Sequence, residues 1–114
     1  MTTLTIKSVE FKAILSGQKK RDYRDPSLIN KKRLLKKNAS GQFDRNTDIK
    51  EIKFLNGFKK DAPFVVMEVL DIIPVHFVNA YTNTDDCFTC VAGVDQIEIT
   101  LGQIITKGGN HGKE

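Results

Sequence analysis

The chain has 114 residues, the size of one ordinary domain, and 39% of them are apolar, which excludes a wholly disordered protein. Its longest uninterrupted apolar stretch, Phe64–Met67, is far shorter than the ~18 residues of a membrane span, so we expect no membrane partner. Residues 1–5 lack a basic flank and an apolar signal core, so we expect no export. Two cysteines in such a chain predict reduced thiols and a cytoplasmic location rather than a disulfide scaffold.

Charge is distributed unevenly along the chain, although its net value is only +4. Residues 1–60 hold sixteen Lys and Arg against six Asp and Glu, a balance of +10, whereas residues 61–114 hold two against eight, a balance of −6. This asymmetry predicts a basic face that binds a polyanion. The alternative is that the two halves attract each other within one fold.

The first elements have clear boundaries. Residues 4–7 alternate apolar and polar as in a short strand, and a helix is predicted over residues 8–16, with Ser8 as its N-cap. Gly17 ends this helix, because glycine is favoured at the left-handed position after a helix. A polar extended segment follows over residues 18–25.

The middle of the chain is basic and rich in turn residues. Residues 27–37 predict a short helical or irregular stretch, and residues 38–47 predict an exposed loop. Asn56-Gly57 indicates a turn between two strands. The strand after this turn, residues 64–73, is apolar on both faces, as expected of a central strand.

The C-terminal third predicts further strands over residues 87–94 and 97–101, with a bulge at Gly102. One helix followed by several strands is typical of a small α+β protein, and we expect its sheet to curl into a β-barrel. The predicted domain covers residues 1–107, and residues 108–114 are expected to form a flexible tail.

The junction after the first helix reads Gly17-x-Lys19-x-x-Asp22-x-Arg24. It resembles the ASCH superfamily of PUA-like domains, which carries G-x-K-x-x-E-x-R at this position. The resemblance extends over most of residues 4–105, including a stretch similar to the family's last strand at residues 99–105. Position 22 is Asp, where the family has Glu or, in its amidohydrolase branch, Thr.

The resemblance implies a PUA-like β-barrel with one or two flanking helices and a ligand cleft beside the motif. It further implies binding of RNA, a nucleotide or a modified nucleoside, and in one branch hydrolysis of the amide of N4-acetylcytidine.

Three residues of the motif are candidates for the site. Lys19 suits a phosphate contact or, with a lowered pKa, a base or nucleophile, and the alternative is a surface lysine. Asp22 and Arg24 share one face of a strand, so Arg24 could bind phosphate while Asp22 accepts a hydrogen bond from a base or ribose. The alternative for this pair is a structural ion pair.

Glu68 is the only charged residue between Phe64 and Leu70, so we expect its side chain to point into an apolar interior. Burial would raise its pKa and suit it to general acid or base catalysis. In an enzyme, Lys19 would then be the base and Glu68 the proton shuttle. The alternative is a buried ion pair with Arg24 or Lys19.

A basic run outside the motif, Lys31, Lys32 and Arg33 with Lys36 and Lys37, could follow a nucleic-acid backbone, or it could be a solvated loop. Cys87-x-x-Cys90 lacks a second pair of ligands, so two free thiols and no metal are predicted.

Three functions therefore stay open. The first is an RNA- or nucleotide-binding module, the second is an amidohydrolase acting on an acylated nucleoside, and the third is a small mobile-element protein that blocks or sequesters an acidic partner. No cofactor is expected, and the oligomeric state stays open.

Overall fold

A computed structural model of the protein describes residues 1–109. Two helices and nine strands follow each other along this part of the chain: β1 (Thr2–Ile6), α1 (Ser8–Leu15), β2 (Arg21–Arg24), α2 (Leu28–Leu34), β3 (Lys36–Lys37), β4 (Phe43–Asp44), β5 (Glu51–Asn56), β6 (Phe64–Phe77), β7 (Tyr81–Asn83), β8 (Phe88–Cys90) and β9 (Val94–Gly108). The predicted α+β class is confirmed. No helix of the described part is long and apolar enough to cross a membrane.

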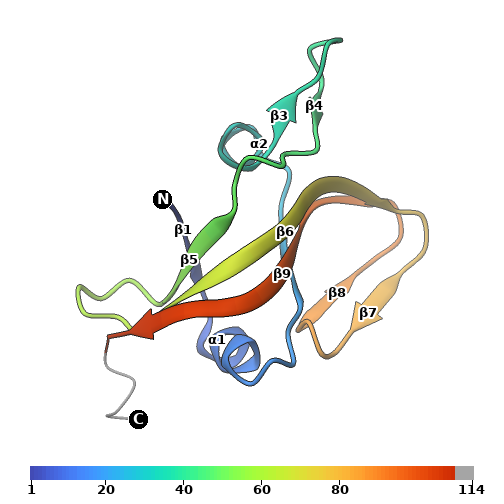
Figure 1. The fold of residues 1–114 in the computed structure, drawn as a ribbon. Coiled ribbons are helices and arrows are strands. Elements are labelled where there is room, and N and C mark those ends of the chain that lie inside the picture. Colours follow the sequence, from blue (N-terminus) through green and yellow to red (C-terminus); the bar gives the residue numbers. More distant parts are fainter. Residues whose placement is uncertain (110–114) are drawn as a thin grey trace.

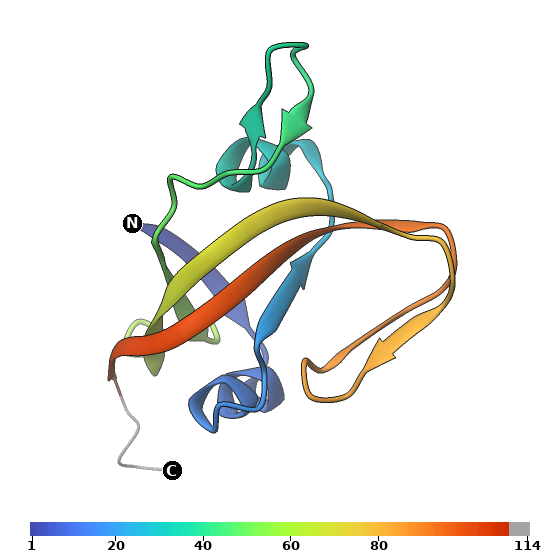
Figure 2. The same ribbon diagram turned by 45° about the vertical axis from the view of Figure 1, so that its right-hand side comes forward.

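Five strands form one mixed sheet in the order β1-β5-β6-β9-β2. β1 runs parallel to β5, and the other neighbours are antiparallel. The long strands β6 and β9 bend strongly, so that the sheet curls and brings its two edge strands to the same side of the molecule (Figures 1 and 2). Within residues 1–109 no ladder joins β1 to β2, so the sheet is open along this seam rather than a closed barrel.

The hollow of the curled sheet holds the core. Alternate residues of the strands point inward, among them Leu4 and Ile6 of β1 and Ile97 and Ile99 of β9, all of them buried. Phe11 and Ile14, one helical turn apart on α1, cover one end of this core. The helix therefore fixes the position of the chain that follows it, which carries the motif.

The start of α1 differs from the prediction by one residue. Lys7 occupies the N-cap position without a side-chain hydrogen bond, and Ser8 is the first helical residue. The end agrees with the prediction, because Gly17 has a φ of 81° and donates its N–H to the carbonyl of Ile14.

Two further boundaries differ. The loop predicted at residues 38–47 contains part of a two-stranded hairpin, β3 with β4, which projects from the top of the molecule in Figure 1. β9 continues to Gly108, which pairs with Phe64, so the predicted tail cannot begin there. The remainder of that prediction, residues 110–114, lies outside the described residues.

The expected inward position of Glu68 is wrong. β6 buries Val65, Met67 and Val69 on its core face, and Glu68 is exposed on the opposite face with Leu70. Its Oε1 accepts a hydrogen bond from the backbone N–H of Gln103 (3.2 Å), at the irregular pairing with β9 where Gly102 was predicted to form a bulge. Because β6 carries apolar residues on both faces, the sequence did not indicate which face is buried.

Candidate binding site

Lys19 is buried, contrary to the surface-lysine alternative. Its side chain is 1% exposed, and its Nζ donates a hydrogen bond to the carbonyl of Asp86 at 2.6 Å. The same Nζ lies 3.5 Å from Oδ1 of Asp22 and 3.7 Å from Oε1 of Glu10. A buried ammonium group requires such partners, because desolvation without them would be costly. In this structure Lys19 binds the carbonyl of Asp86 and the carboxylate of Asp22 and is shielded from solvent.

Asp22 and Arg24 form the ion pair that the two-residue spacing allows. Oδ2 of the buried Asp22 accepts a hydrogen bond from Nε of Arg24 at 2.7 Å. Nη1 of Arg24 donates to the carbonyl of Thr5 at 3.1 Å, which links edge strand β2 to edge strand β1 across the open seam. Nη2 of Arg24 makes no hydrogen bond within the described part of the chain, and 20% of this side chain is exposed.

A cleft of about 630 Å³ lies along this seam. One wall is the end of β1 and the start of α1, the other is the strand β2, and the turn after β5 forms the rim. Its polar and charged lining comprises Thr5, Lys7, Ser8, Glu10, Asp22, Tyr23, Arg24, Asp25 and Asn56. Asp22 and Arg24 of the motif therefore reach the cleft, whereas Lys19 lies behind Asp22 and is not part of its lining.

Asp86, which the sequence analysis did not identify, connects the motif to a distant hairpin. This buried residue follows β7 in the turn before β8. Its Oδ1 accepts the backbone N–H groups of Lys20 at 2.8 Å and Arg21 at 3.1 Å. Among residues 1–109 its Oδ2 finds no hydrogen-bond partner, and Nη1 of Arg21 lies 3.7 Å from it. The sequence marks Asp86 only as an acidic residue in a turn, and many exposed turns contain such a residue.

An aromatic cluster joins the same hairpin to β2. The ring of Tyr23 stacks on Phe88 with centroids 4.0 Å apart and meets Phe77 edge-on at 5.9 Å. Its hydroxyl donates to Oε2 of Glu98 at 3.0 Å. Burial, and then this hydrogen bond and the charge of Glu98, raise the pKa of Tyr23 above its ordinary value. These contacts give Tyr23 a packing role between β2 and the hairpin.

Glu68 does not join the site. It is neither in the lining of the cleft nor paired with Lys19 or Arg24, since its described contact is the backbone of Gln103. The predicted pairing of Lys19 as base with Glu68 as proton shuttle therefore has no geometric basis in this structure.

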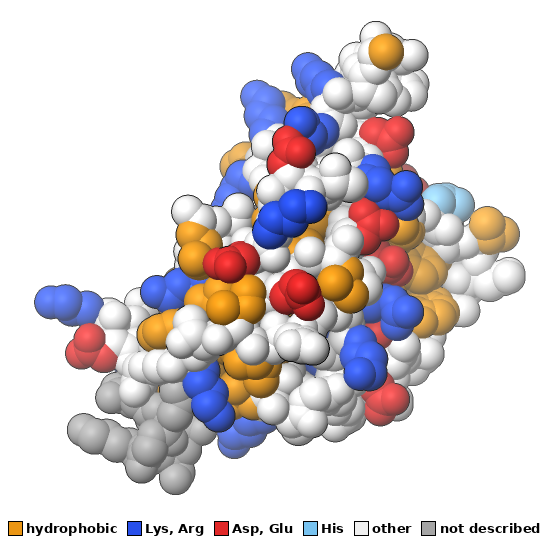
Figure 3. Space-filling view, viewed as in Figure 1, with side chains coloured by type: hydrophobic (Ala, Val, Ile, Leu, Met, Phe, Trp, Pro, Cys, Tyr) orange, Lys and Arg blue, Asp and Glu red, His pale blue; other side chains and the backbone are white. Residues whose placement is uncertain are grey.

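The residues of the basic run make separate contacts. Lys31 lines a separate hollow of about 280 Å³ together with His76 and Asp95, while Arg33 points to β1 and donates to the carbonyl of Thr3 at 2.7 Å. Lys36 forms a salt bridge with Asp48 and lowers the pKa of that carboxyl group, and Lys37 lies over the ring of Phe43. Lys32 is exposed. On the face seen in Figure 3, positive and negative side chains are interspersed.

The thiols of Cys87 and Cys90 are half-buried and unbridged. No group of three or more His, Cys, Asp or Glu in residues 1–109 is placed to hold a metal ion. Comparisons of the chain with models of known families, with curated proteins and with solved structures find no significant match.

Proposed function

We propose that the protein binds a nucleotide or RNA in the seam cleft, as a PUA-like module in which Arg24 bridges the edge strands β1 and β2 of the open sheet. The observation that carries this proposal is the position of Arg24, a guanidinium held on two sides at the wall of a cleft of about 630 Å³. That volume lies in the range of small-ligand sites, ~300–1,000 Å³. Phosphate is a preferred partner of such a group.

The charges around Arg24 favour a nucleotide over a simple polyanion. Lys7 and Arg24 are accompanied in the lining by the carboxylates of Glu10, Asp22 and Asp25. A surface that binds polyanions through their phosphates alone would carry cations without such a balance. A nucleotide combines one phosphate with amino, imino and hydroxyl donors, so a cleft of mixed charge can satisfy both ends of it.

The motif residues take different roles from those first expected. Arg24 is the phosphate-binding group together with the exposed Lys7, while Lys19 and Asp22 orient Arg24 from behind. Both carboxylate oxygens of Asp22 face cations, so the hydrogen bond to a base or ribose falls to Glu10 or to the amide of Asn56.

The test is a charge reversal at the rim with a matched control. Lys7→Glu should weaken binding of the four nucleoside 5′-monophosphates, measured by calorimetry, because it replaces an attracting group in the cleft with a repelling one. Lys12→Glu makes the same change in net charge on the exposed side of α1, outside the cleft, and should leave affinity within about two-fold. Equal losses in the two variants, or no binding by the unaltered protein, would contradict the proposal.

A further inference from the structure

Phe58 has an exposure that folding does not explain. Its side chain is 93% exposed, although an aromatic ring of this size is among the side chains that gain most from burial. Nine other large apolar side chains of the described residues are exposed to 39–78%, all of them aliphatic. Phe58 also lies at the rim of the seam cleft, and aromatic side chains are common in the lining of ligand sites.

The loop between β5 and β6 holds Phe58 in this position. Gly57 adopts a φ of 96°, which non-glycine residues rarely adopt, and directs the chain outward after β5. The loop is closed by backbone hydrogen bonds from Asn56 to the carbonyl of Pro63 at 2.9 Å and from Ala62 to the carbonyl of Lys59 at 3.1 Å. Phe58 is therefore presented by a hydrogen-bonded turn rather than by an unsupported segment.

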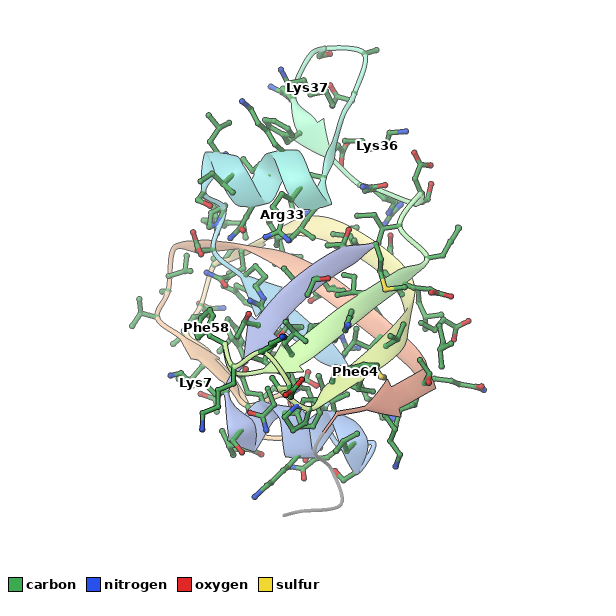
Figure 4. All side chains as sticks on the ribbon, turned by 90° about the vertical axis from the view of Figure 1, so that its left-hand side faces the viewer. Lys7, Arg33, Lys36, Lys37, Phe58 and Phe64 are labelled. Carbon is green, nitrogen blue, oxygen red and sulfur yellow. The ribbon has the colours of Figure 1, made fainter. Side chains whose placement is uncertain are left out.

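Phe58 lies between two hollows. It lines the seam cleft and also a hollow of about 550 Å³ formed by its own loop, residues 56–63. Figure 4 shows Phe58 next to Lys7 at the C-terminal end of β1. Lys59 and Lys60 follow directly in the chain, are exposed and line the second hollow, together with Asp61.

We infer that the protein binds a single strand of at least two nucleotides, one seated in the seam cleft and the next stacked on Phe58. This inference rests on the proposed function and deepens it, because it favours a strand over a free nucleotide as the ligand and assigns the second base to Phe58. Aromatic rings that stack bases, flanked by cations that contact the backbone, are the usual means of binding single strands. Phe58 with Lys59 and Lys60 provides both groups in three consecutive residues, and the cleft and the loop hollow meet at this ring.

The natural absence of tryptophan permits a direct assay. Phe58→Trp introduces one fluorophore at the stacking position, and an RNA octanucleotide of random sequence should quench it. Val91→Trp serves as the control, because Val91 is 71% exposed in the turn after β8 and lines neither hollow. Its fluorescence should not respond to the same RNA.

Affinity measurements complete the test. Phe58→Ala should weaken binding of the octanucleotide about five-fold or more, and by a larger factor than it weakens binding of nucleoside monophosphates, because Phe58 also lines the seam cleft. If monophosphates bind the unaltered protein but the octanucleotide binds no tighter, or if Phe58→Ala keeps full affinity for it, the inference is wrong and the proposed function stands. If neither probe binds, both are wrong.

Discussion

Lys19→Met tests whether the motif lysine supports the fold, as its burial indicates. Methionine keeps an unbranched apolar side chain and removes the charge. The carbonyl of Asp86 then loses a charged hydrogen bond of 2.6 Å, a contribution of about 1.5–3 kcal/mol. Asp22 also loses one of its two cationic partners, although Arg24 still compensates its charge. We therefore expect the free energy of unfolding to fall by about 2–4 kcal/mol.

The assay is urea denaturation followed by circular dichroism, with the midpoint and slope compared between variants. Lys20→Met is the matched control, because Lys20 is the exposed neighbour and only its backbone contacts Asp86. Its effect should stay within about 0.5 kcal/mol. If Lys19→Met is no more destabilising than Lys20→Met, the buried ammonium group is not the support that the distances indicate.

Two further predictions concern the partners of the motif. Asp86→Ala should lower the free energy of unfolding by about 1–3 kcal/mol, because it leaves the N–H groups of Lys20 and Arg21 without their acceptor. The control Asp85→Ala removes an exposed carboxylate and should change the free energy of unfolding little in the same denaturation assay. Because folding raises the pKa of Tyr23, the absorbance of the unaltered protein at 295 nm should rise above the ordinary tyrosine pKa of ~10 in a step that Tyr23→Phe removes. Since folding raises this pKa, the stability linked to Tyr23 is complete below pH ~10 and is lost as pH rises further. A loss of this stability towards acid pH would contradict the raised pKa of Tyr23.

The elements of the fold follow well from local patterns. Helix α1 and the central strand β6 lie where periodicity predicted them. β5 ends at the predicted Asn56-Gly57, but a loop over residues 57–63 rather than a tight turn leads to β6. These features depend on residues that are close in the chain, so the sequence contains their cause. The short hairpin of β3 and β4 was missed because two-residue strands have no periodicity to detect.

The face of a strand was harder to predict. Glu68 shares its side of β6 with Phe64 and Leu70, an apolar context that indicated an interior position. The core face of β6 at this point is instead the face of Val65 and Met67. Further along the strand, the pairing with β9 shifts between Val69 and Asp71, and the next buried residue is Ile72. A register shift of this kind is set by the partner strand and moves side chains to the other face. Local sequence therefore could not assign Glu68.

The role of Lys19 depended on a residue 67 positions away. The motif placed Lys19 beside Asp22 and Arg24, and this grouping is what the structure shows. Its burial follows from Asp86, whose carbonyl and carboxylate bind the Lys19–Arg21 segment from the hairpin of β7 and β8. No spacing rule connects these two segments, since their contact arises only when the sheet curls.

The contacts from the hairpin of β7 and β8 reach Arg24 at the wall of the cleft. Asp86 holds Lys19, Lys19 lies against Asp22, and Asp22 fixes Nε of Arg24, whose Nη1 is held by the carbonyl of Thr5. A guanidinium restrained on both sides loses little conformational freedom when it meets phosphate, which favours binding without adding any contact. The hairpin of β7 and β8, although outside the cleft, thus belongs to the shell that orients its principal cation.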